Sequence, residues 1–154
     1  MRLSARSDVA QAPEAVFDAI AEFRSIARLA RRPGVEVERI DDLSAPAAGM
    51  GWRVHFTLRR RRRQVVLRLT RFDRPEGLSF EGRGRAFETL ATLDLIALSP
   101  ARTRMAVTVE ILPRTLLARL AAWPARLLRR RLERRLDRRL SEYARGLERR
   151  IGAA

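Results

Sequence analysis

The chain has 154 residues, of which 46% are hydrophobic and 33% charged, so it fits one folded domain, residues 1–154, with a genuine core. It has no cysteine, which excludes disulfides and thiolate chemistry and makes a reducing compartment the default expectation. The formal net charge of +15 predicts attraction to polyanions. Every basic residue is arginine, however, so codon bias in a GC-rich genome is a second explanation for the charge.

Neither end of the chain shows an export or membrane signal. The first eight residues break up their apolar side chains too quickly to form the core of a signal peptide. Arg119 and Arg126 interrupt the most hydrophobic part of the C-terminal region, and no apolar run approaches the roughly 20 residues of a membrane span. We therefore expect a soluble cytoplasmic protein.

The N-terminal region predicts one strand and two short helices. Leu3 to Val9 is a weak strand, and Pro13 followed by Glu14 marks the start of a helix. The apolar face of that helix consists of Val16, Phe17, Ile20 and Phe23. A second brief helix is expected to include Ile26 and Leu29, ending before Pro33 and Gly34.

The middle of the chain predicts about six further strands, at residues 35–40, 52–58, 65–70, 78–81, 87–98 and 103–112. Short turns join most of them, which favours antiparallel pairing because parallel neighbours need crossovers of about a dozen residues. The run from Arg59 to Arg63 is interpreted as a hairpin tip. The inward face of the strand at 87–98 stays open, because both of its faces are apolar.

The stretch from Thr115 to Ile151 predicts a long helix that covers the sheet. A single apolar stripe runs along its second part, through Leu128, Leu132, Leu136, Leu140, Tyr143, Leu147 and Ile151. Pro124 is expected to kink or split the helix, because proline lacks an amide proton. The resulting fold class is α+β: a curved antiparallel sheet of about six or seven strands, two short helices and one long C-terminal helix packed across it.

Five features in this order resemble the SRPBCC superfamily, the START-like or helix-grip proteins that include polyketide cyclase/dehydrase-like members. They are Ala12-Pro13-Glu14-Ala15-Val16-Phe17, Gly49-Met50-Gly51-Trp52-Arg53-Val54, Phe72-Asp73-Arg74-Pro75-Glu76-Gly77-Leu78-Ser79-Phe80, Ser99-Pro100-Ala101-Arg102-Thr103-Arg104 and the long terminal helix. The resemblance covers nearly the whole chain and implies a helix-grip fold with a cavity under the long helix. Ligands and activities vary widely in this superfamily, so the resemblance supports a cavity better than a reaction.

No catalytic, metal or cofactor constellation is visible. His55 is the only histidine, which removes the usual two-histidine metal sites, and its strand position favours a surface role. Gly82 and Gly84 are too closely spaced for a dinucleotide loop. We expect no cofactor and assign no catalytic residue. One alternative stays open: Asp94, between two leucines, would serve a cyclase- or hydrolase-type enzyme if it were buried in the pocket.

The leading hypothesis is a binding protein for a small apolar or lipid-like molecule, with a non-catalytic role favoured over an enzymatic one. The residues expected to line its cavity come from the first helix, the sheet and the cover: Phe17, Trp52, Val54, Phe56, Leu67, Leu69, Phe80, Met105, Val107, Val109, Leu120, Leu127, Leu128 and Leu132. Each of them is also a reasonable packed-core residue.

A third hypothesis is peripheral binding to an anionic membrane or RNA through Arg59, Arg60, Arg61, Arg62 and Arg63. Guanidinium groups bind phosphate bidentately, so either polyanion is chemically suitable. The run has no aromatic residue to stack on bases, which disfavours nucleic acid and makes a lipid surface the better candidate of the two.

Overall fold

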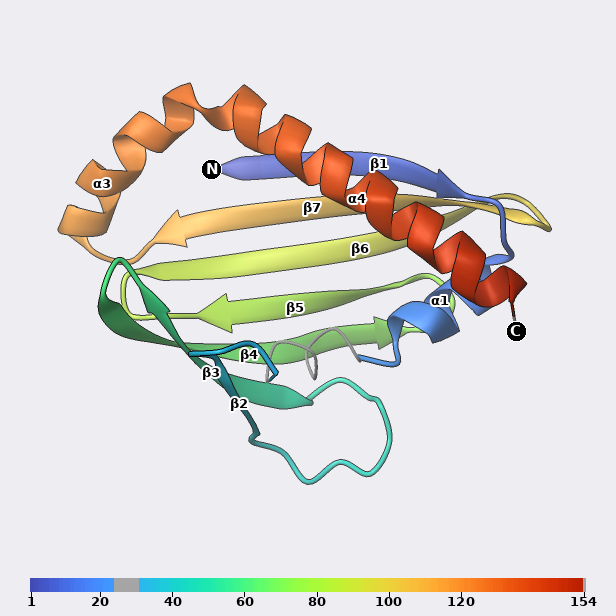
Figure 1. The fold of residues 1–154 in the computed structure, drawn as a ribbon, viewed down its shortest axis with the longest axis horizontal. Coiled ribbons are helices and arrows are strands. Elements are labelled where there is room, and N and C mark those ends of the chain that lie inside the picture. Colours follow the sequence, from blue (N-terminus) through green and yellow to red (C-terminus); the bar gives the residue numbers. More distant parts are fainter. Residues whose placement is uncertain (24–30, 154) are drawn as a thin grey trace.

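The computed structural model describes residues 1–23 and 31–153 and has the α+β architecture expected from the sequence (Figure 1). The strands are β1 (Arg2–Val9), β2 (Glu36–Arg39), β3 (Gly51–Leu58), β4 (Arg61–Asp73), β5 (Gly77–Arg83), β6 (Phe87–Ser99) and β7 (Arg102–Pro113). The helices are α1 (Pro13–Ile20), α3 (Leu116–Leu127) and α4 (Arg129–Gly152). Ile26 and Leu29, on which the expected second short helix depends, lie outside the described residues.

All seven strands form one antiparallel sheet in the order β1-β7-β6-β5-β4-β3-β2. Strands β2 to β6 each pair with the next strand along the chain, and β1 completes the order by pairing with β7. Helix α4 runs diagonally across one face of this sheet and ends beside α1 (Figure 1). The antiparallel sheet and the helix-grip arrangement confirm the fold class predicted from the sequence.

The core lies between α4, α1 and the covered face of the sheet. Leu140, Ala144 and Leu147 of α4 are buried at four- and three-residue intervals, so the predicted stripe does face the sheet. Phe17 of α1 and Met105 of β7 are fully buried against the same layer. Burying a large aliphatic side chain such as Leu147 contributes roughly 1.5–3 kcal/mol, so these contacts hold the helix in place.

The hairpin between β3 and β4 is tighter than the sequence suggested. Only Arg59 and Arg60 form the turn, because Arg61 pairs with Leu58 and Arg63 pairs with Phe56. Both turn residues have positive φ, at 52° and 65°. This is the left-handed conformation that two-residue hairpins require and that glycine or asparagine normally supplies.

The C-terminal helical region splits, as Pro124 had led us to expect, but the break lies at Leu128 rather than at the proline. Helix α3 contains Pro124, and Thr115 caps its first turn by accepting a hydrogen bond from the Ala118 amide at 3.0 Å. Leu128 leaves the helical conformation with φ −97° and ψ 7°. The two helices therefore point in different directions, and only α4 crosses the sheet (Figure 1).

Candidate ligand-binding site

The covered face of the sheet is predominantly apolar, and its side chains fall into a packed part and an accessible part. Strand alternation places Trp52, Val54 and Phe56 of β3 on this face, where Trp52 lies opposite Leu67 of β4. Near α1 the side chains are fully buried. Farther along the strands they are only half-buried although they point toward the core, so α4 does not cover the whole face.

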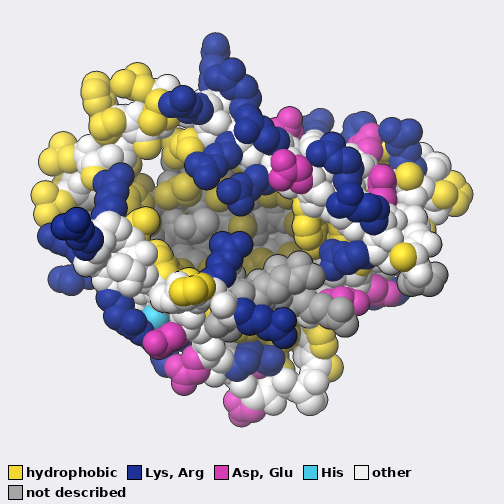
Figure 2. All heavy atoms as spheres, in the orientation of Figure 1, with side chains coloured by type: hydrophobic (Ala, Val, Ile, Leu, Met, Phe, Trp, Pro, Cys, Tyr) yellow, Lys and Arg dark blue, Asp and Glu magenta, His cyan; other side chains and the backbone are white. Residues whose placement is uncertain are grey.

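We name the accessible part the sheet hollow and define it by five half-buried inward residues: Phe56, Leu67, Phe80, Val107 and Val109. Figure 2 shows a deep recess in this face of the molecule, with both apolar and basic side chains around its rim. Four of the five residues also pack against the main buried cluster, whereas Val109 lies outside it, opposite buried Leu3 of β1. Val109 therefore marks the end of the hollow on the β1 side of the sheet.

An aromatic cluster forms the wall of the hollow nearest α1. Phe23 lies 5.6 Å from Trp52 and 6.0 Å from Phe80, measured between ring centroids. Phe17 meets Phe72 edge-on at 5.1 Å. Such pairs contribute about 0.5–1.5 kcal/mol beyond their area burial, so the cluster fixes one wall of the hollow.

The cluster includes Phe72, which alternation alone does not place on this face. A register shift between Leu69 and Arg71 inserts one extra residue into β4, and Phe72 consequently points the same way as Leu69. Nothing in the sequence marks this bulge. Phe23 was identifiable from the apolar face of the first helix, but it was not among the expected cavity residues.

A second recess, of about 490 Å³, lies beside Trp52 at the β2–β3 loop and is lined by Phe23, Val37, Met50 and Arg39, among others. The Arg39 guanidinium lies 5.7 Å from the Trp52 ring centroid and donates two hydrogen bonds to Asp41, at 2.6 and 2.7 Å. Asp41 also accepts from the amides of Leu43 and Gly51. These bonds, led by those from Arg39, hold the pKa of Asp41 well below its usual range and fix the loop at the mouth of the recess.

The structure sorts the expected cavity residues into three groups. Five are buried in the core: Phe17, Trp52, Val54, Leu69 and Met105. Six are half-buried, five of them on the covered side of the sheet and one on α4: Phe56, Leu67, Phe80, Val107, Val109 and Leu132. That a ligand contacts this second group stays a prediction.

The third group differs from expectation, because Leu120, Leu127 and Leu128 are exposed and do not cover the sheet. At about 100° per residue, Leu120 and Leu127 lie roughly 120–140° away from Leu132 around a continuous helix. The stripe of α3 is therefore out of phase with the stripe of α4. A phase count along the whole helical region would have found this, whereas counting leucines within each half does not.

The candidate acid of the enzymatic alternative is not in the hollow. Asp94 alternates with the core residues Leu93 and Leu95, so it points to the opposite face of the sheet. There it pairs with Arg71 at 2.9 Å, with 49% of its side chain exposed. The enzymatic hypothesis loses its only named residue. His55 contacts Gln64 at the exposed β3–β4 surface, as the sequence had indicated.

Among the described residues, no three His, Cys, Asp or Glu side chains are grouped to hold a metal ion. No helix in residues 1–23 or 31–153 is long and apolar enough to cross a membrane.

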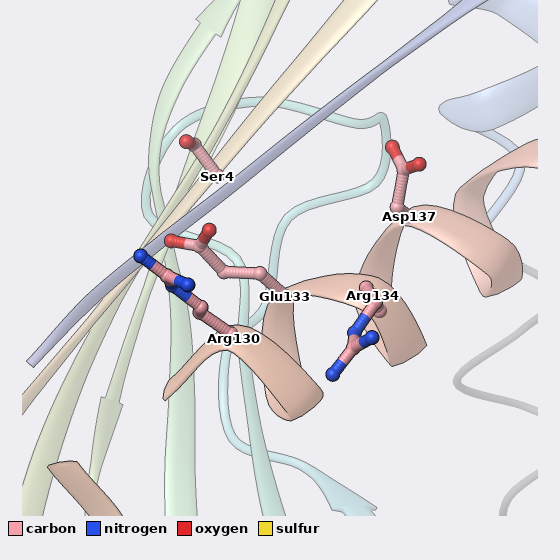
Figure 3. A pocket seen from close by; sticks show the side chains of 5 residues that line it. All are labelled: Ser4, Arg130, Glu133, Arg134 and Asp137. Carbon is pink, nitrogen blue, oxygen red and sulfur yellow. The ribbon is translucent and has the colours of Figure 1, made fainter. Parts of the chain in front are cut away.

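A further groove, of about 460 Å³, lies at the sheet edge between β1 and α4 (Figure 3). Its lining alternates charge, with Arg130, Glu133, Arg134 and Asp137 from α4 and Ser4 from β1. Figure 3 shows Glu133 directed toward β1 beside Arg130, while Arg134 points away. Acids and bases in this groove offset each other, so it does not concentrate charge of one sign.

The arginine run at the β3–β4 hairpin is exposed, as expected, but it is not uniform. Arg62 is held by Glu36 at 2.9 Å. Within the described residues, Arg59, Arg60, Arg61 and Arg63 make no ion pair, so four cations stand together at one end of the sheet.

The seven-stranded sheet gripped by a C-terminal helix defines a helix-grip α+β protein. A family model described as "polyketide cyclase / dehydrase and lipid transport" matches residues 1–148. The chain therefore belongs to this family, and the resemblance to SRPBCC proteins is confirmed. A search of curated protein sequences finds no match.

Solved structures support the same fold at low sequence identity. A protein from Thermus thermophilus, TTHA0849, is 15% identical, with a TM-score of 0.63 over 99% of this chain and 98% of that one. The ZhuI aromatase/cyclase from Streptomyces sp. R1128 is 15% identical, with a TM-score of 0.56 over 75% and 69% of the two chains. Norcoclaurine synthase from Thalictrum flavum is 11% identical, with a TM-score of 0.61 over 80% and 82%. At these identities the likeness concerns the fold alone.

Proposed function

We propose that this protein binds a small apolar molecule in the sheet hollow. The observation that carries the proposal is the half-burial of Phe56, Leu67, Phe80, Val107 and Val109 on a face whose neighbouring residues are fully packed. Apolar side chains that point inward and remain accessible favour an apolar guest. Family membership is consistent with this use of the fold.

The binding energy would come mainly from burial of apolar surface. Each 100 Å² of apolar ligand surface removed from water contributes roughly 2.5 kcal/mol before the entropic cost of binding. The hollow carries no buried charge to recognise a polar ligand: among the described residues, Thr103 is the only polar residue that is buried as a whole, and its hydroxyl donates to the Gln11 carbonyl. Affinity should therefore fall as polar groups are added to the ligand.

A filling substitution tests the location of the site. Val109→Phe adds a ring inside the hollow, whereas Thr108→Phe adds the same ring on the opposite face of β7. The probe is N-phenylnaphthylamine, a neutral dye whose fluorescence rises in apolar surroundings. We expect Val109→Phe to weaken dye binding about tenfold or more and Thr108→Phe to leave it within about twofold.

Thermal unfolding of both variants accompanies the titration, so that loss of binding is separated from loss of folding. Equal dye affinity in the wild-type protein and the folded Val109→Phe variant would contradict the proposed site. Native mass spectrometry of the freshly purified protein, with extraction of any retained molecule, then gives the chemical class of the natural ligand.

A further inference from the structure

In helix α3 the large apolar side chains face solvent, which is the reverse of an ordinary amphipathic helix. Its contact with the domain is made by alanines: Ala118 is buried, and Ala122 and Ala125 are half-buried. The large apolar side chains point into solvent, with exposed fractions of 77% for Leu116, 80% for Leu117, 72% for Leu120, 66% for Trp123 and 80% for Leu127.

Four of these five exposed residues form one continuous stripe, and Leu117 lies beside it. At about 100° per residue, Leu116, Leu120, Trp123 and Leu127 fall within roughly 60° of arc, while the alanines lie on the far side of the helix. Single exposed leucines are ordinary on a protein surface, but a contiguous apolar patch indicates an interaction site. The exposed patch is visible as a projecting apolar group at the α3 corner of the molecule (Figure 2).

The charges around the stripe are all positive. From residue 114 to residue 132 the chain has no acidic side chain, and Arg119 and Arg126 flank the stripe on one side of the helix. Neither arginine makes an ion pair within the described part of the chain. An apolar helix face bordered by unpaired arginines is complementary to a partner that has an anionic outer layer over an apolar interior.

The arginine hairpin lies at the same end of the sheet. The antiparallel order places the β3–β4 turn at the edge where β7 ends and α3 begins, and Arg114 confirms this by donating to the Gly84 carbonyl of the neighbouring β5–β6 turn at 2.7 Å. Strands β4 and β7 are three strand spacings apart, or about 14 Å at roughly 4.8 Å each. Arg59, Arg60, Arg61 and Arg63 therefore enlarge the positive surface beside α3.

We propose that α3 docks this protein on an anionic lipid bilayer, with the helix lying in the plane of the interface. Its 12 residues span only about 18 Å, which suits an interfacial position and not a crossing. Leucines and Trp123 enter the boundary between headgroups and acyl chains, where tryptophan is favoured, and the arginines contact the phosphates. This docking does not depend on the hollow being occupied.

Vesicle sedimentation tests the proposal with the full chain. The probes are vesicles of phosphatidylcholine alone and of phosphatidylcholine with about 30% phosphatidylglycerol. We expect binding to the anionic vesicles, and a loss of about tenfold or more in the Leu117→Gln/Leu120→Gln variant. The matched control, Ile96→Gln/Leu98→Gln, removes two exposed apolar side chains from the other end of β6 and should bind within about twofold of wild type.

Tryptophan fluorescence reports the depth of insertion. Trp52 is buried, so a blue shift on addition of anionic vesicles would come from Trp123, and Trp123→Phe should abolish the shift while retaining sedimentation. Both glutamine substitutions fall on exposed positions, and circular dichroism checks that the variant is folded.

Three outcomes would overturn the proposal. The first is equal binding of the wild-type protein and Leu117→Gln/Leu120→Gln to anionic vesicles. The second is equal wild-type binding to neutral and anionic vesicles. The third is no vesicle binding together with a concentration-dependent dimer that the glutamine variant loses, which would assign the stripe to a second copy of the chain.

Discussion

The β3–β4 hairpin gives a direct test of the backbone geometry, because its two turn residues are of a type that disfavours the conformation they adopt. Arg59 and Arg60 both have positive φ. For residues other than glycine, asparagine and aspartate, this left-handed region costs roughly 1–2 kcal/mol per residue. The replacement Arg59→Asn/Arg60→Gly supplies the pair that this turn type prefers.

The expected gain is smaller than the full strain. Relief at two positions amounts to about 2–4 kcal/mol, but asparagine keeps part of the cost, and glycine loses about 0.5–1 kcal/mol more conformational entropy on folding. We therefore expect the free energy of unfolding to rise by about 1–2 kcal/mol. For a chain of this size that corresponds to an increase of roughly 3–6 °C in the midpoint of thermal unfolding.

The double replacement also removes two positive charges from the arginine run, so charge and backbone geometry must be separated. Arg59→Gln/Arg60→Gln removes the same charges and retains two β-carbons in the left-handed region. We expect its stability to stay within about 0.5 kcal/mol of wild type. Urea unfolding followed by circular dichroism measures all three proteins. If the Asn-Gly variant is no more stable than the Gln-Gln variant, the assigned turn is wrong.

Two further predictions concern single positions. A β-carbon at Gly77 would collide with the Leu93 carbonyl oxygen of β6, so Gly77→Ala should destabilise the fold by about 1–3 kcal/mol in urea unfolding, and an unchanged midpoint would contradict the close approach of β5 and β6. Because folding lowers the pKa of Asp41 from its ordinary 3.8, its contribution is present above that pH and is lost as the pH falls through the folded value. Asp41→Asn should thus flatten the decline of the urea midpoint below about pH 4, and a slope equal to that of the wild type would contradict this reasoning.

Much of the sheet was predictable because strand alternation is a local property. Val54 and Phe56 alternate with polar residues, and short turns join the strands, so both the inward face and the antiparallel order follow from the sequence. The buried stripe of α4 was equally accessible, since Leu140 and Leu147 recur with helical spacing. In these elements the spacing of the apolar residues and the core that they contact indicate the same inward face.

The features that could not be predicted depend on an irregularity or on a distant partner. The bulge after Leu69 reverses the facing of Phe72 without any sequence marker. Asp94 was ambiguous because both faces of β6 are apolar, and its outward position is settled by strand register and by Arg71 from β4. The sequence predicts a turn of five arginines, because charge alone does not reveal that three of them continue the ladder.

The two C-terminal helices show why an apolar stripe does not by itself predict what covers it. Each helix turns one face toward the domain. On α3 that face consists of the alanines Ala118, Ala122 and Ala125, and on α4 it includes the large residues Leu140 and Leu147. The leucines of α3 lie on the other side of their helix, so the domain does not cover them and they stay available to a binding partner.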